Sequence, residues 1–163
     1  MRTILAIIMV MVSVAASTAA ETYDDPKALV SAIYAAYQPG QLASDPAQFY
    51  SKRLIGLFDQ RLDEKIFEND AAMKGEAVPA APPFNPFLPD TSALLFDLAI
   101  GEPTILANRA LINVSYHNFD QPRLLSIALV KEDGGWKVDD VSAVGAEDHW
   151  LLSWALVYDP QSY

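Results

Sequence analysis

The chain has 163 residues and carries 21 acidic against 11 basic side chains, which gives it a formal net charge of −10 at pH 7. A surface of this sign repels nucleic acid and anionic lipid, so neither is an expected partner. The chain contains no cysteine. No disulfide can therefore stabilise the fold, and stability must come from an apolar core.

Residues 1–20 have the layout of a secretory signal peptide. Arg2 is followed by an apolar run over 4–14 and then by small residues up to Glu21. The run is shorter than the ~20 apolar residues that span a bilayer. We therefore expect cleavage before Glu21, a periplasmic or secreted product, and no membrane insertion after cleavage. Residues 21–163 are expected to form a single α+β domain.

Two helical segments come first in this domain. Asp25 is a predicted N-cap with Pro26 at the first helical position, and apolar residues recur at helical spacing as far as Tyr37. A second segment covers 46–74 and begins with the same Asp-Pro signal. Gly56 leaves open whether this segment is one helix or two.

A proline-rich loop follows over 76–91, which holds five of the eleven prolines. Proline fixes φ and removes a hydrogen-bond donor, so this loop is expected to lack a regular ladder. Phe84, Phe87 and Leu88 are too apolar for a free linker. We expect these three side chains to pack on the domain.

The remaining sequence predicts an antiparallel sheet, because alternating apolar segments are separated by turn signals. The predicted strands cover 93–100, 103–119, 122–132 and 135–144. A last helix over 148–158 is expected to turn Trp150, Leu151 and Trp154 toward the core. The N-terminal helices then cover one face of a curved antiparallel sheet.

Three stretches carry a resemblance to a known family: IYAAY at 33–37, FNPFLPD at 84–90 and DGGWKVDDV at 133–141. With the order of the elements, they resemble the nuclear-transport-factor-2-like superfamily of cone-shaped, cystatin-like α+β domains. More narrowly, the chain resembles the bacterial domain of unknown function 3828, whose members are exported. Asn85 stands where that family favours an aspartate. The superfamily hosts isomerases, cyclases, dehydratases and binding modules, so the resemblance implies no single activity.

Asp139 and Asp140 are an adjacent pair of carboxylates with a possible role in acid–base chemistry. Strict alternation along a strand places Trp136, Val138 and Asp140 on one face and Asp139 on the other. Carboxylates that point apart cannot share a proton. Asp140 alone is then expected to turn inward. It would act there as a cavity-lining acid or base, or as a carboxylate that accepts backbone hydrogen bonds at a strand end.

Asp97 and His117 are the other catalytic candidates. Asp97 lies in an apolar run and either lines a cavity or faces water on an edge strand. His117 either forms a general-base pair with Asp97 or Asp140 or is a surface histidine. His149 is the only other histidine, and no spacing in the chain matches a known metal motif. No metal and no cofactor is predicted.

Five residues are candidates for lining a ligand pocket: Tyr34, Tyr37, Tyr116, Trp136 and Arg109. The aromatic residues either line a pocket for an apolar ligand or belong to the core. Arg109 either pairs with a carboxylate or holds an anionic ligand.

The sequence favours an exported binding or accessory module of the bacterial envelope, whose partner is a small molecule or an envelope protein. The alternative is a cofactor-free isomerase, dehydratase or cyclase with an Asp, His and Tyr pocket. A homodimer formed through the exposed face of the sheet is a third hypothesis.

Overall fold

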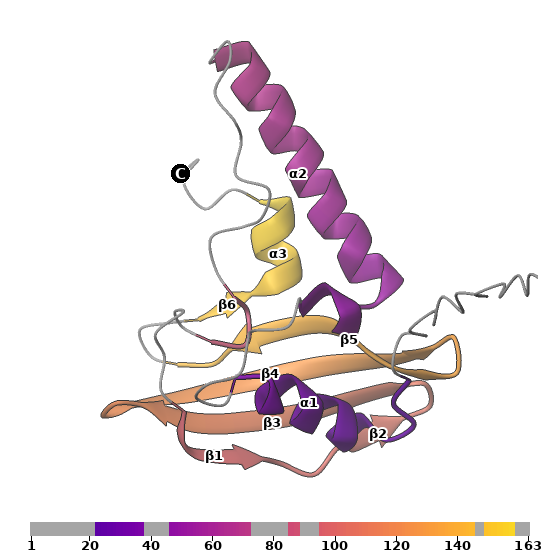
Figure 1. Cartoon of the computed structure of the whole chain (residues 1–163), viewed down its shortest axis with the longest axis vertical. Helices are drawn as coiled ribbons and strands as arrows, with labels where there is room; N and C mark the ends of the chain where they lie inside the picture. Colours follow the sequence, from indigo (N-terminus) through magenta and orange to yellow (C-terminus); the bar gives the residue numbers. More distant parts are fainter. Residues whose placement is uncertain (1–21, 38–45, 73–84, 89–94, 146–148, 159–163) are drawn as a thin grey trace, which may run out of the picture.

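The computed structural model describes residues 22–37, 46–72, 85–88, 95–145 and 149–158, with the backbone alone over 64–72 (Figure 1). The expected signal peptide over 1–20 and Phe84 lie outside these residues. The described elements are α1 (Pro26–Ala35), the 3-10 helix η1 (Pro46–Phe49), α2 (Lys52–Ala72), β1 (Phe96–Ile100), β2 (Thr104–Leu106), β3 (Arg109–Asn118), β4 (Gln121–Glu132), β5 (Gly135–Ala143), β6 (Trp150–Leu151) and α3 (Leu152–Val157).

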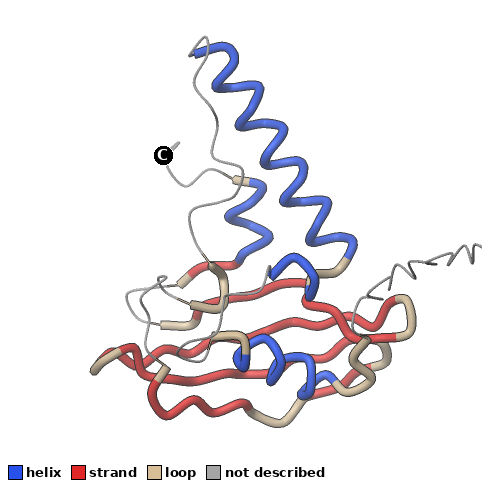
Figure 2. Tube along the Cα trace, viewed as in Figure 1, coloured by secondary structure: helices blue, strands red, loops and turns tan. Residues whose placement is uncertain are grey.

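The six strands form one antiparallel, curved and unclosed sheet, in the order β1-β3-β4-β5-β6 with β2 also paired to β3 (Figure 2). The helices come before the sheet and after it, so the predicted α+β class is confirmed. Consecutive strands β3, β4 and β5 are neighbours, and this arrangement suits the short turns between them. None of the described helices is long and apolar enough to cross a membrane.

Helix α1 begins at the predicted signals. The side chain of Asp25 accepts hydrogen bonds from the backbone N–H groups of Lys27 and Ala28, both at 3.2 Å, and Pro26 occupies the first turn. This carboxylate satisfies two donors that a helix start would otherwise leave unpaired. The apolar stripe of the helix, Leu29, Val30, Ile33 and Tyr34, is completely or almost completely buried.

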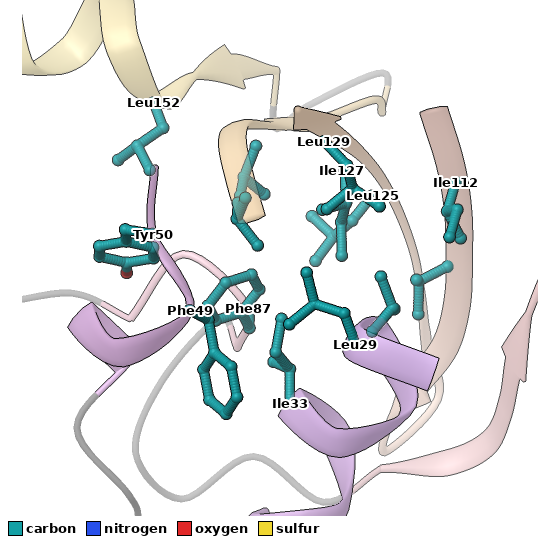
Figure 3. Close-up of a cluster of buried hydrophobic side chains, with 14 of the residues drawn as sticks. Leu29, Ile33, Phe49, Tyr50, Phe87, Ile112, Leu125, Ile127, Leu129 and Leu152 are labelled. Carbon is teal, nitrogen blue, oxygen red and sulfur yellow. The ribbon is translucent and has the colours of Figure 1, made fainter. Parts of the chain in front are cut away.

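The core lies between α1 and the concave side of the sheet. Residues of β3 alternate between exposed and buried along the whole strand, as expected for a strand with one covered face. Leu29 and Ile33 of α1 point toward side chains of β3 and β4 (Figure 3). The buried strand residues in this layer include Ile112, Val114, Leu125, Ile127 and Leu129.

The segment after the first loop is one 3-10 turn followed by one uninterrupted helix, which answers the question raised by Gly56. Helix α2 begins beside β5 and rises away from the sheet, with α3 next to it (Figure 1). A Cβ at Gly56 would meet no atom within 4 Å. No close contact therefore requires glycine at this position.

Two predicted elements differ from the structure. The predicted strand over 103–119 is a hairpin of β2 and β3, with a turn at Ala107 (φ 54°). The predicted helix over 148–158 begins only after β6, whose pairing with Ser142 and Ala143 of β5 sets where α3 starts.

The start of α3 decides which of its residues are buried. Leu152 and Leu156 face the core, whereas Leu151 and Trp154 are exposed, so the expectation for these last two side chains was wrong. Trp150 is partly buried against the core, as expected. The expected burial of Phe87 and Leu88 is confirmed.

The free edge of β5 is covered by the chain itself. The backbone N–H of Trp136 donates to the carbonyl of Tyr23 at 2.8 Å, and that of Ser51 donates to the carbonyl of Val138 at 2.8 Å. The indole Nε1 of Trp136 donates to the carbonyl of Asp24 at 3.1 Å. The two backbone contacts pair part of the β5 edge that would otherwise be open to another chain.

Candidate functional site

A β-bulge in β5 changes the interpretation of the two adjacent aspartates. Leu129 of β4 pairs with Val138 and Ala128 pairs with Asp140, so Asp139 is the extra residue. An extra residue reverses the alternation beyond it. Val138 and Val141 are therefore both buried. The prediction that Asp140 shares a face with Trp136 and Val138 was wrong, because strict alternation does not survive the bulge.

Asp139 is the more deeply buried of the two carboxylates, with 6% of the residue exposed. It accepts hydrogen bonds from Ser51 Oγ at 2.8 Å and from Arg53 Nε at 2.9 Å, and Arg109 Nη1 lies 3.3 Å from its other oxygen. Burial alone raises the pKa of this carboxyl, but the donors from Arg53 and Ser51 and the two guanidinium charges outweigh burial and lower the pKa. Asp139 is thus held as a charged anchor for the start of α2.

Asp140 holds the start of α3. One carboxylate oxygen accepts from the backbone N–H of Ser153 at 3.0 Å and from that of Val141 at 2.9 Å, and the other accepts from Ser153 Oγ. Leu151, the N-cap of α3, offers no capping side chain. A carboxylate from the neighbouring strand therefore caps this helix.

Both aspartates meet one guanidinium, since Arg53 Nη2 lies 3.7 Å from Asp140 Oδ2 while Arg53 Nε binds Asp139. The prediction that the two carboxylates point apart was therefore wrong. The Arg53 side chain contacts both carboxylates, whereas in a proton-sharing dyad the two carboxyl groups contact each other. This cluster suits anchoring of helices better than proton transfer.

Asp97 and His117 lie together at the other end of the sheet. The pairing register of β1 with β3 shifts between Phe96 and Ala99, and Asp97 within this irregular stretch has a φ of 52°. Its Oδ2 lies 3.6 Å from His117 Nδ1, a separation longer than a hydrogen bond. Within the part of the chain that the structure describes, His117 Nδ1 is buried and has no hydrogen-bond partner. The Asp97 side chain itself is 85% exposed.

The catalytic candidates fall into two separate groups. His117 pairs with Pro122 of β4, whereas Asp140 pairs with Ala128 of the same strand. Six residues along a strand and two strand spacings separate them by about 20 Å. Asp140 and His117 therefore cannot act on the same small substrate, whereas Asp97 and His117 are close enough to do so.

Three of the five predicted pocket residues, Tyr34, Tyr37 and Tyr116, gather around one short turn. The hydroxyls of Tyr34 and Tyr116 both donate to the carbonyl of Phe87, at 3.4 and 3.3 Å. Asn85 Nδ2 donates to the hydroxyl of Tyr37 at 2.7 Å. These contacts connect α1 and β3 to a turn that comes from neither element.

The other two predicted pocket residues lie elsewhere. Trp136 holds the N-terminal segment through Asp24, and Arg109 faces Asp139. Sequence analysis placed Asp139 on the face opposite Asp140 and assigned no role to Arg53 or Ser51. Ser51 also caps α2, because its Oγ accepts from the backbone N–H of Leu54 at 3.0 Å, so its place before the helix was a local signal. No local pattern pointed to Arg53.

The turn at Asn85–Leu88 places an aromatic side chain in the centre of this cluster. Phe87 has no exposed surface, and its ring contacts those of Tyr34 and Tyr50 at centroid distances of 6.4 and 6.2 Å. Its backbone N–H donates to Asn85 Oδ1 at 2.9 Å, and the N–H of Leu88 donates to the carbonyl of Asn85 at 3.2 Å. An Asn-Pro pair is a known signal for such a turn.

Burial raises the pKa of Tyr34 well above its ordinary value, and the neighbouring Tyr116 and Tyr37 raise it further. Burial also raises the pKa of Tyr37, although the hydrogen bond from Asn85 partly opposes this effect. Both hydroxyls are consequently neutral at physiological pH. Tyr34 thus remains a hydrogen-bond donor.

The described residues contain no group of three or more His, Asp or Glu side chains that could hold a metal ion. Comparison of the chain with protein-family models, with curated proteins and with solved structures finds no match. The resemblance to the nuclear-transport-factor-2-like superfamily therefore stays a prediction that rests on the residues quoted above.

Proposed function

We propose that this chain is a small exported binding module of the bacterial envelope, which acts by docking on another envelope protein. One observation supports this proposal most directly: α3 carries an exposed aromatic face. Trp154, Val157 and Tyr158 are 51%, 45% and 49% exposed. The rings of Trp154 and Tyr158 lie against each other, with centroids 5.1 Å apart.

The spacing of these residues explains why they form one surface. Positions three and four apart share a face of a helix, so Trp154, Val157 and Tyr158 lie together while Leu152 and Leu156 face the core. Tryptophan and tyrosine are enriched at protein interfaces, where they carry much of the binding energy. An exposed helix face of this kind suits an apolar groove on a partner.

The distribution of charge on this chain indicates what chemistry the partner's binding surface should have. Helix α3 contains no charged residue, whereas the whole chain carries a net charge of −10. A groove with an apolar floor and a basic rim would match both features. Attraction of opposite charges accelerates such an encounter, so the association rate should fall as salt rises.

Photo-crosslinking in the producing cell tests the proposal. A photoreactive phenylalanine analogue in place of Trp154 should crosslink to one envelope protein. The same analogue in place of Leu106, which is 80% exposed on β2, is the matched control. Trp154→Ser should weaken binding to that protein by about 30-fold, the effect of a typical hot-spot residue. Equal crosslinking from both positions would contradict docking through α3.

A second copy of the chain is the other protein partner to consider. On the uncovered face of the sheet, β3 from Leu111 to Ser115 and β4 from Leu124 to Ala128 present no charged side chain. Two acidic copies could meet there without close contact between like charges. Sedimentation should then show a dimer that Leu111→Lys converts to a monomer, whereas a wild-type monomer at high concentration would contradict pairing.

A cofactor-free enzyme is the second candidate function, and the 3.6 Å approach of Asp97 Oδ2 to His117 Nδ1 favours it. A carboxylate at Nδ1 orients a histidine so that Nε2 can take a proton from a substrate. In this case His117→Ala and Asp97→Asn would both abolish turnover of a substrate while the protein stays folded. Turnover that survives His117→Ala would rule out this pair as the base.

A further inference from the structure

The turn at Asn85–Leu88 is bound by the rest of the domain much as a peptide is bound by a receptor. The backbone of Phe87 takes no part in a sheet or helix, and its polar groups are satisfied by side chains. Its N–H donates to Asn85, and its carbonyl accepts from Tyr34 and Tyr116. Its ring is enclosed by aromatic neighbours.

The enclosing residues belong to the domain's regular framework, whereas the turn does not. Tyr34 lies in α1, Tyr116 in β3, and Tyr50 is bridged to Val138 of β5. The rings of Tyr34 and Tyr116 are 6.3 Å apart, so their hydroxyls can reach one acceptor. The framework therefore presents two aimed donors beside an aromatic site, an arrangement that fixes the orientation of a ligand.

The hydroxyls of Tyr34 and Tyr116 lie farther from the carbonyl of Phe87 than is usual for a hydrogen bond. Their distances to the Phe87 carbonyl are 3.4 and 3.3 Å, whereas hydrogen bonds between a hydroxyl and an oxygen are most often about 2.7–2.8 Å long. An external carbonyl that approached more closely would form stronger bonds than the chain's own carbonyl does. At these two donors, a closer carbonyl would therefore compete with the carbonyl of Phe87.

We infer that the site formed by Tyr34, Tyr50 and Tyr116 is a recognition site for an aromatic residue with an adjacent acceptor carbonyl, and that Phe87 occupies it as an internal ligand. The ligand class is a peptide with an Asn-Pro-aromatic turn. Such a peptide binds by displacing the turn, so its apparent dissociation constant equals the intrinsic constant divided by the fraction of open sites. This site is separate from the α3 face and does not depend on docking there.

The experiment uses fluorescence anisotropy with a labelled, end-blocked peptide of sequence Asn-Pro-Phe-Leu and the full-length processed protein. The wild type should bind the peptide. Asn85→Ala removes the donor to Tyr37 and the acceptor for the Phe87 N–H while it keeps the ring. Because it loosens the internal ligand, it should tighten peptide binding by about tenfold or more. Phe87→Ala should tighten binding further.

Two controls identify the contacts. A peptide with alanine in place of phenylalanine should not bind. Tyr116→Phe removes a hydroxyl donor that also holds the turn, so it is tested in the Asn85→Ala background, where the turn is already loosened and the change should weaken peptide binding by up to about tenfold. Trp154→Ser should leave peptide binding unchanged, so that failure of docking through α3 and failure of this site remain distinguishable.

Several results would overturn the inference. If the wild type and folded Asn85→Ala bind no peptide at millimolar concentration, the turn is a fixed part of the core, even where Phe87→Ala binds. Equal binding of the alanine peptide would show that the ring is not recognised, and no effect of Tyr116→Phe in the Asn85→Ala background would show that the carbonyl is not recognised. Should Phe87→Ala fail to fold, Asn85→Ala decides the question.

Discussion

Replacement of Asp139 by asparagine tests the role of the buried carboxylate in the β5 bulge. Asparagine has the same shape and retains an oxygen that can accept from Ser51, but it removes the charge that Arg53 and Arg109 face. The anchor between the start of α2 and the sheet should weaken. The protein should remain folded, because the apolar core is untouched.

The size of the effect follows from the exposure of the partners. Removing one member of a fully buried ion pair costs about 3–5 kcal/mol. Here the side chains of Arg53 and Arg109 are 48% and 67% exposed, so water can solvate both after the change. Exposed pairs contribute about 0.2–1 kcal/mol. We therefore expect Asp139→Asn to lower the free energy of unfolding by about 1–2 kcal/mol at pH 7, between these limits.

The dependence on pH gives a second, independent readout. The pKa of Asp139 is lowered from its ordinary value of 3.8 in the folded protein. Its contribution to stability is therefore fully present above that value and is lost as the pH falls through the folded-state pKa. In urea titrations, wild type and Asp139→Asn should differ at pH 7 and converge as the pH falls below about 4.

Asp97→Asn is the matched control, since that carboxylate is 85% exposed. It should change the free energy of unfolding by less than about 0.5 kcal/mol. The assigned role of Asp139 would be refuted by an Asp139→Asn protein as stable as the wild type at pH 7, or by a difference that persists undiminished at low pH.

Four further predictions concern other parts of the chain. A Cβ at Gly135 would lie 2.6 Å from Thr22 Cγ2 and 3.2 Å from the backbone N of Tyr23, so Gly135→Ala should lower stability by about 1–3 kcal/mol in urea titrations. Gly56→Ala, with open space around it, should instead raise stability by about 0.5–1 kcal/mol. The pKa of Tyr34 is raised in the folded protein, so its neutral hydroxyl contributes stability. This contribution is fully present at pH values below the ordinary tyrosine pKa of 10.0 and is lost as the pH rises through the folded-state pKa. Tyr34→Phe should therefore reduce the alkaline loss of stability, whereas an unchanged alkaline profile would contradict the assignment. Finally, mass spectrometry of the exported protein should find Glu21 at its N-terminus, and an intact chain in the membrane fraction would contradict export by cleavage.

Local signals in the sequence were sufficient for much of the fold. Asp25 and Pro26 mark a helix start through contacts within three residues, so their effect does not depend on the rest of the chain. Alternation likewise predicted a strand in the region of β3, where the ladder with β4 is regular. The α+β class follows from the order of such elements.

Features that depend on distant partners could not be predicted in this way. The bulge at Asp139 exists only in the register of β5 against β4, and alternation within one strand carries no record of it. Two of the hydrogen-bond donors to that carboxylate are Ser51 and Arg53, more than 80 residues away in sequence. The sequence singled out the tyrosines as pocket or core residues, but the position of Phe87 between them follows from tertiary packing alone.

The two aspartates of β5 link the stability of the fold to the proposed docking face. Asp140 accepts the hydrogen bonds of Ser153 and so fixes the start of α3, whose exposed side presents Trp154. Asp140→Ala should therefore weaken docking although it leaves every exposed residue of that face in place. Asp140→Asn keeps an acceptor for Ser153 and should retain most of the affinity, because the neutral cap loses only part of the interaction. Binding to the partner identified by crosslinking measures both variants. If Asp140→Ala binds the partner as tightly as Asp140→Asn does, capping by Asp140 does not control how α3 presents Trp154.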